Sequence, residues 1–160
     1  MDNDSWNKLV GQLYGYGDRQ YWLIQPGHDE AYKLLYMIKT LVAAERIYAF
    51  DEYMTRAEWI KPGDLVCFEL PGKGIAAHAE VESGPVYRLH YKVEDPVSCP
   101  WVITLKDVHI YLDDPVRMSL DLSNQLDLRP NPRQCCFTYG LPRVDNLTEH
   151  DFRLLTKNTK

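Results

Sequence analysis

The residues best suited to chemistry in this sequence are a histidine and a glutamate two positions apart, His78 and Glu80. They match half of the zinc deaminase motif, in which the histidine binds zinc and the glutamate transfers protons. The other half, P-C-x-x-C, does not follow, and the small residues around the pair alternate as in a β-strand. His78, Glu80 and His109 therefore indicate two alternatives: an enzyme site on strand faces that line a common pocket, or solvent-facing strand residues.

Other metal-binding and nucleophile motifs are not found in the sequence. The cysteines form no C-x-x-C pair, so we expect free thiols in a reducing compartment rather than zinc ligands or disulfides. Gly72-Lys73-Gly74 lacks the rest of a phosphate-binding loop. We therefore expect no metal and no cofactor. Folding can still assemble a catalytic site from distant residues, so an enzyme remains an alternative to a binding module.

Aromatic residues make up 12% of the chain and are a second candidate for a binding site. Five of them fall where a strand end, a helix end and a turn can meet: Trp22, Tyr48, Phe50, Tyr53 and Trp59. Such rings can clamp a flat ring or a methylated group by stacking, and they are also ordinary core material in a small domain. Both interpretations stay open at this point.

Sequence periodicity indicates the elements that must hold these residues. Residues 20–25 predict a strand, residues 31–42 an amphipathic helix, and residues 65–70 and 75–82 a hairpin. On the second arm of the hairpin we expect Ile75, Ala77, Ala79 and Val81 to face the core. Further elements are a helix over residues 5–13, an apolar break over 47–50, a short helix capped by Asp51, one long bent strand or a pair of strands over 101–112 with a bulge or turn near Lys106, and helices capped by Ser119 and Thr148.

These patterns predict an α+β fold with five or six short strands and three or four flanking helices. The length of 160 residues fits one domain, and we expect residues 1–160 to form it. The longest apolar stretch is interrupted by Lys39 and Thr40, and the first residues lack a basic region. We therefore expect a cytoplasmic protein with no membrane contact.

Charge bears on the choice of partner. The chain has a net charge of -5, which disfavours nonspecific binding to nucleic acid. Residues 129–160 differ from the rest, because they carry six basic and three acidic side chains. A basic segment on an acidic body can present a local footprint for a polyanion, and the acidic surface equally suits a protein partner.

The residues Lys61-Pro62-Gly63-Asp64, followed by a V-x-F strand and the strand over residues 74–81, resemble the EVE family of the PUA-like superfold. The resemblance covers about residues 20–156 and extends to four further segments, at residues 21–23, 45–50, 101–112 and 148–155. It implies a PUA-like pseudobarrel of five or six mostly antiparallel strands. Related YTH domains carry a tryptophan where this chain has Tyr48.

The resemblance also implies a function, which is non-catalytic binding of DNA or RNA that carries a methylated or hydroxymethylated base. It places Trp22, Tyr48, Phe50 and Trp59 around the base, with Arg46, Arg129 and Arg133 on phosphate. A nuclease or another protein is an expected further partner. The alternatives are a small-molecule or protein-binding module on the same fold, or an enzyme that uses His78 and Glu80.

Overall fold

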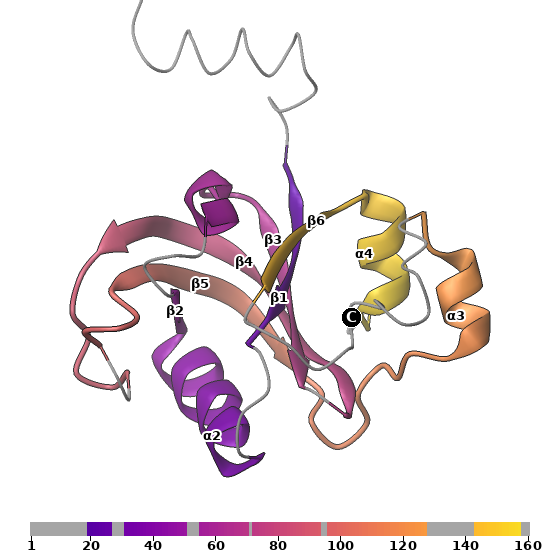
Figure 1. Ribbon diagram of the computed structural model, residues 1–160, viewed down its shortest axis with the longest axis horizontal. Helices are drawn as coiled ribbons and strands as arrows, with labels where there is room; N and C mark the ends of the chain where they lie inside the picture. Colours follow the sequence, from indigo (N-terminus) through magenta and orange to yellow (C-terminus); the bar gives the residue numbers. More distant parts are fainter. Residues whose placement is uncertain are drawn as a thin grey trace, which may run out of the picture.

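The protein forms one curled sheet of six strands in the order β2-β5-β4-β3-β1-β6 (Figure 1). The computed structural model describes residues 19–26, 31–50, 55–70, 72–93, 96–127 and 143–157. Its strands are β1 (Tyr21–Gln25), β2 (Ile47–Phe50), β3 (Leu65–Leu70), β4 (Gly74–Tyr87), β5 (Trp101–Ile110) and β6 (Arg143–Leu147). β1 runs parallel to β3, and the other neighbouring strands are antiparallel. The predicted α+β fold, with a mostly antiparallel half-barrel, is confirmed.

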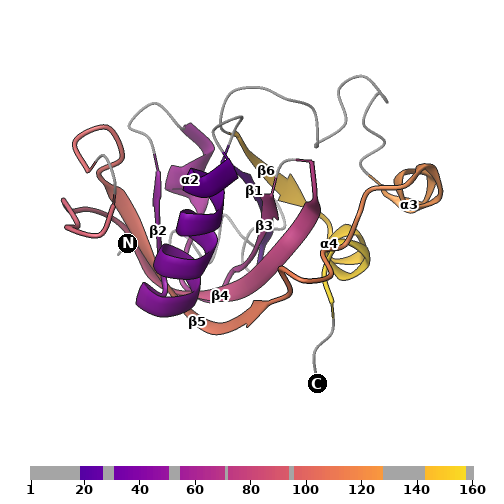
Figure 2. The same cartoon turned by 90° about the horizontal axis from the view of Figure 1, so that it is seen from below.

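Helices cover both faces of this sheet (Figure 2). α2 (Ala31–Tyr36) continues as a π-helix, η1 (Met37–Glu45), and together they follow the predicted amphipathic helix. We call the sheet face that packs against this helix the inner face. α4 (Glu149–Leu155) packs on the outer face, where α3 (Leu120–Gln125) also lies, and a short 3-10 helix, η2 (Thr55–Trp59), precedes β3.

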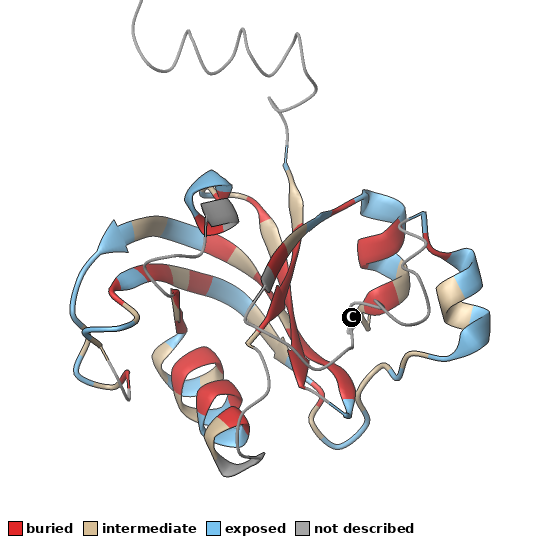
Figure 3. Ribbon diagram, viewed as in Figure 1, coloured by how far each residue is buried: buried red, intermediate tan, exposed pale blue. Residues whose placement is uncertain are grey.

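Strands β1 and β3 are buried on both sides, because successive residues of each strand point alternately into two different cores. Trp22 of β1 and Phe68 of β3 point to the inner core with η1. Leu23 and Cys67 point to the outer core, where they meet Phe152 of α4. Burial on both faces is typical of strands that pair in parallel. The parallel pair therefore lies between η1 on the inner face and α4 on the outer face, and buried residues follow one another along its strands (Figure 3).

Two irregularities bend the long strands. β5 is a single strand with Asp107 in the left-handed region at φ 50°, which confirms the predicted bulge near Lys106. In β4 the pairing with β3 shifts after Phe68. As a result Ile75 belongs to the outer core and Ala76 is buried, so the predicted inward row is wrong at Ile75 and correct from Ala77 onward.

The remaining predictions differ in outcome. Ser119 and Thr148 cap α3 and α4, because their hydroxyl oxygens accept hydrogen bonds from the backbone N–H groups of Leu122 and Asp151. The predicted break over residues 47–50 is a strand, β2, and β6 was not predicted. The predicted helix over residues 5–13 and the cap Asp51 lie outside the described residues. No helix in the described ranges is long and apolar enough to cross a bilayer.

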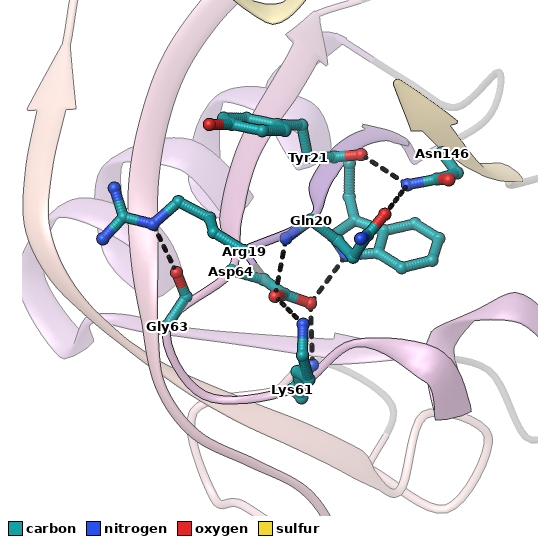
Figure 4. A network of polar contacts seen from close by, with 8 residues as sticks. Arg19, Gln20, Tyr21, Lys61, Gly63, Asp64 and Asn146 are labelled. Carbon is teal, nitrogen blue, oxygen red and sulfur yellow. Dashed lines mark hydrogen bonds and ion pairs between the residues drawn. The ribbon is translucent and has the colours of Figure 1, made fainter. Parts of the chain in front are cut away.

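The carboxylate of Asp64 holds the start of the parallel pair together (Figure 4). Its Oδ1 accepts hydrogen bonds from the backbone N–H of Gln20 at 3.0 Å and from Nζ of Lys61 at 2.6 Å. Its Oδ2 accepts from the indole Nε1 of Trp22 at 2.9 Å and from the backbone N–H of Lys61 at 3.0 Å. Asp64 is fully buried, so these four donors take the place of the water that a carboxylate requires.

We predict that Asp64→Asn destabilises the protein, because one carboxylate oxygen becomes an NH₂ group that faces two donors. Each buried donor left without an acceptor costs about 1 to 3 kcal/mol. The free energy of unfolding from urea titrations measures the loss. The same change at the exposed Asp113 is the control and is expected to stay within about 0.5 kcal/mol. Equal stability of the two variants contradicts a structural role for the Asp64 network.

Candidate functional site

Three of the predicted base-binding aromatic residues lie in the inner core. Trp22, Tyr48 and Phe50 are all buried, and Tyr48 is only 5% exposed. The ring of Tyr48 packs at 4.9 Å from that of Phe50 and at 5.3 Å from that of Phe68, measured between ring centroids. Burial raises the pKa of the Tyr48 hydroxyl. Of the two interpretations left open for these aromatic residues, the structure favours core packing at these three positions, because β1 and β2 are buried strands.

Of the other predicted site residues, two are exposed and two lie outside the described residues. Trp59 is 64% exposed at the end of η2. Arg46 is exposed and adopts the left-handed conformation, at φ 56°, that ends η1. Arg129 and Arg133 lie outside the described residues. A role for these arginines in phosphate binding stays a prediction.

A pocket of about 590 Å³ opens on the outer face of the sheet, beside α4. Its walls come from β1, β3, β4, β5 and α4 and from the residues that follow α4. His78, Glu80 and His109 all line it, so the expectation that these three residues share a pocket is confirmed. Sequence reasoning did not assign the other lining residues to a site, and among them are Arg19, Tyr21, Asp107, Glu149, Phe152, Arg153 and Lys157.

Stacked histidine rings form one wall of the pocket. His78 of β4 and His109 of β5 are register partners, and their ring centroids lie 4.6 Å apart with the planes inclined by 24°. Nδ1 of His78 lies 3.1 Å from the hydroxyl of Tyr111. Burial, and to a lesser degree the ring of His109, lowers the pKa of His78 from 6.5 to about 4. His78 is therefore a neutral imidazole at pH 7, and its Nδ1 either accepts a hydrogen bond from the Tyr111 hydroxyl or donates one to it, according to the tautomer.

Two further rings continue the aromatic wall. The ring of Phe152 lies 6.1 Å from that of His78 in an edge-to-face arrangement and 5.3 Å from the ring of Tyr21. Burial, followed by the nearby Glu149 carboxylate, raises the pKa of Tyr21. The hydroxyl of Tyr21 thus stays protonated at neutral pH. The pocket combines ring surfaces with hydroxyl and imidazole groups that can donate or accept hydrogen bonds.

Ion pairs surround these rings. Glu80 contacts Nη2 of Arg19 at 3.0 Å and Nζ of Lys106 at 2.9 Å. On α4, Arg153 contacts Glu149 at 2.5 Å. Lys157 contacts Asp114, which lies beyond the pocket wall. The lining includes three basic and three carboxylate side chains, so its formal charge is zero with neutral histidines.

A possible metal-binding group lies elsewhere. Ligand atoms of Asp127, His150 and Asp151 lie within 4.8 Å of one another, and this is the one such trio in the part of the chain that the structure describes. Hydrogen bonds within the fold already occupy these side chains: Asp127 accepts from Thr148, Asp151 accepts from the backbone of Asp127, and His150 contacts the Gln125 carbonyl oxygen. His78, Glu80 and His109 do not form such a trio, so their geometry does not match that of a zinc site.

Comparison with known proteins assigns no family to the fold and pocket described above. No protein-family model matches the chain, and no curated protein matches it in sequence. The class that the structure itself defines is a curled α+β half-barrel of six strands, with a charge-balanced aromatic pocket on its outer face.

We predict that Tyr48→Ala lowers the free energy of unfolding by about 3 to 5 kcal/mol, because it removes a buried ring and leaves a cavity. Urea denaturation followed by circular dichroism measures the loss. Trp59→Ala removes a ring that is mostly exposed and serves as the control, for which we expect a change of about 0.5 kcal/mol or less. A small loss at Tyr48 would restore it as a candidate wall of a binding site.

The lowered pKa of His78 predicts a pH-dependent stability. Between pH 6.5 and about 4 the unfolded chain binds a proton at His78 that the folded protein largely excludes. Stability therefore falls as the pH drops through this window, whereas above pH 6.5 His78 has no effect on it. Melting temperatures of the protein and of His78→Gln, measured from pH 7.5 to 4, separate this effect from that of the carboxylates. A variant with an equally steep decline contradicts the prediction.

Proposed function

We propose that this protein is a non-catalytic module that binds an unpaired base of DNA or RNA in the outer-face pocket. The observation that carries the proposal is the group of partly exposed rings of Tyr21, His78 and His109, packed against the buried Phe152, in a pocket of zero formal charge. Stacking on such rings contributes about 1 to 3 kcal/mol per base. The hydroxyl and imidazole groups supply partners for the polar edge of a base.

The ion pairs favour a base over a phosphate as the group inside the pocket. Arg19 and Arg153 already contact carboxylates at 3.0 Å and 2.5 Å. A phosphate would have to separate these pairs and would then face Glu80 and Glu149. A neutral, planar and polar ring leaves the pairs in place. We therefore expect the sugar-phosphate backbone to remain outside the pocket, in contact with solvent.

The proposal places the base at a different site from the one that the aromatic break predicted. Tyr48 and Phe50 support the sheet from the inner core, and the base is bound on the opposite face. Recognition of a methylated or hydroxymethylated base, which the resemblance to the EVE family implies, remains part of the proposal. A nuclease or another protein, as an additional partner, also remains part of the proposal.

An enzyme that uses His78 and Glu80 is the second candidate, because both side chains line the same pocket. General base catalysis works best with a pKa near the working pH, and the pKa of His78 is about 4. Glu80, the proposed proton carrier, contacts two cations, Arg19 and Lys106. Binding without catalysis therefore agrees better with the geometry of the pocket.

The test is the binding of labelled single-stranded oligonucleotides that differ in one central base: cytosine, 5-methylcytosine, 5-hydroxymethylcytosine, adenine or N6-methyladenine. We predict that His109→Ala weakens binding of the preferred oligonucleotide by about 1 to 3 kcal/mol through lost stacking, with the melting temperature little changed. His150→Ala, an exposed histidine outside the pocket, is the matched control. Fluorescence anisotropy measures both variants. Equal affinity of His109→Ala and the unaltered protein contradicts the proposed site.

A further inference from the structure

The two ring nitrogens of His78 have different surroundings. Nδ1 lies 3.1 Å from the hydroxyl of Tyr111, a buried residue that does not line the pocket. Nε2 has no hydrogen-bond partner in the described part of the chain. It is not enclosed either, because the one enclosed side-chain nitrogen or oxygen without a partner in those ranges is Oε1 of Gln25. Since His78 lines the pocket, Nε2 is the nitrogen that a ligand can reach.

The hydroxyl of Tyr111 has one acceptor within reach among the described residues, and this is Nδ1 of His78. Burial raises the pKa of this hydroxyl, and a hydrogen bond with the backbone of Lys157 opposes the rise. A hydrogen bond that lowers the pKa of a tyrosine stabilises the phenolate, so Lys157 is the donor through its N–H. The hydroxyl oxygen of Tyr111 therefore accepts one hydrogen bond already, and its own proton is left to be donated to His78.

The opposite direction of this hydrogen bond would leave a buried proton without an acceptor. If Nδ1 of His78 carried the proton and donated it, the hydroxyl proton of Tyr111 would have no acceptor among the described residues. An unpaired buried donor is costly enough to shift the tautomer equilibrium about tenfold or more. With Tyr111 as the donor both groups are satisfied, and the neutral His78 ring carries its proton on Nε2.

This tautomer gives the pocket a neutral hydrogen-bond donor that is not used within the protein. Glu80, in contrast, already contacts Arg19 and Lys106. A ligand that displaces water from Nε2–H must offer an acceptor in its place, because the donor is otherwise left unpaired. The ring of His109 is inclined by only 24° to that of His78, so a flat ligand in the plane of His78 is nearly parallel to His109 and can stack on it.

We propose that Nε2–H of His78 donates a hydrogen bond to an acceptor atom of the bound base, and that Tyr111 is the positioning residue that keeps the proton on this nitrogen. The inference rests on the function proposed above and names the class of base that the pocket accepts, which is one with an unmodified ring nitrogen or carbonyl oxygen at this position. A methyl group on carbon 5 of cytosine or on the exocyclic nitrogen of adenine leaves these acceptors unmodified. A methyl group on the acceptor nitrogen itself blocks the bond and gives the base a positive charge.

The position of the proton is tested on the free, full-length chain by NMR. A protonated ring nitrogen resonates far upfield of an unprotonated one, so long-range ¹H–¹⁵N correlation identifies the tautomer. At pH 7 we expect a protonated Nε2 and a bare Nδ1 at His78, and in Tyr111→Phe we expect both ¹⁵N shifts to move toward the average of the two tautomers. Tyr91→Phe removes a hydroxyl from a tyrosine that is 80% exposed, and as the control it is expected to leave the shifts of His78 unchanged. A proton on Nδ1 in the unaltered protein overturns the proposal.

The bond to the ligand is tested with oligonucleotides in which the preferred base loses one acceptor at a time. The analogues carry C–H in place of N1, N3 or N7 of adenine, or C–H in place of N3 and sulfur in place of O2 of cytosine. We expect one analogue to bind about tenfold more weakly than the natural base. The double variant His78→Phe with Tyr111→Phe keeps both rings and removes both hydrogen-bonding groups. It is expected to bind the natural base about tenfold more weakly and that analogue as tightly as before, with a melting temperature that shows it to be folded.

The outcomes separate this inference from the proposed function. If every analogue binds as tightly as the natural base, or if the double variant still discriminates between them, the donated hydrogen bond is overturned and base binding in the pocket stands. If no oligonucleotide binds to the unaltered protein, the proposed function fails and the hydrogen bond to a base fails with it.

Discussion

The arrangement of the whole sheet depends on one buried carboxylate, that of Asp64. Its four hydrogen bonds connect the turn before β3 with the residues that begin β1, and Leu65 then donates its N–H to the Gln20 carbonyl at 3.0 Å. The turn is also connected to β4, because the N–H of Gly63 donates to Val81 and the N–H of Val81 donates to Asp64. A shift of β1 by one residue would turn its inner side chains outward, and it would remove at least some of these bonds. The network therefore fixes the register that places Tyr21 in the pocket wall.

The two faces of the sheet have separate tasks as a result of this register. The inner face packs Trp22, Tyr48 and Phe68 against η1 and leaves these rings without access to solvent. The outer face carries His78 and His109 where α4 leaves part of the sheet uncovered. Asp107, at the bulge of β5, lies between the pairing of Glu80 with Lys106 and that of His78 with His109. On β4, His78 and Glu80 are two residues apart, whereas their partners on β5, His109 and Lys106, are three residues apart. The bulge takes up the extra residue, so that Glu80 and the histidine stack face the same pocket.

Local sequence patterns were sufficient for most of the elements and insufficient for the site. Turn residues on both sides of an apolar run predicted β3, alternation predicted most of β4 and the bent β5, and side-chain caps located α3 and α4. β2 has only four residues, and the residues on either side of Tyr48 are apolar or small. Such a run lacks the alternation of apolar and polar residues that identifies a half-buried strand. The site could be predicted only in part. His78 and His109 were recognised as candidates on strands. Tyr21 reaches the same pocket through the parallel pairing of β1 with β3, and Phe152 reaches it because α4 packs on the outer face. The cap at Thr148 predicted where Phe152 lies on its helix, but no local signal indicates that this helix lies beside β4.

The net charge of the chain does not set the charge within the pocket. Between exposed charges, interactions are largely screened beyond about 8 Å at physiological ionic strength, so a ligand responds to the groups next to it and less to the net charge of -5. In the pocket, carboxylates neutralise the cations and leave a polar site for an uncharged ring.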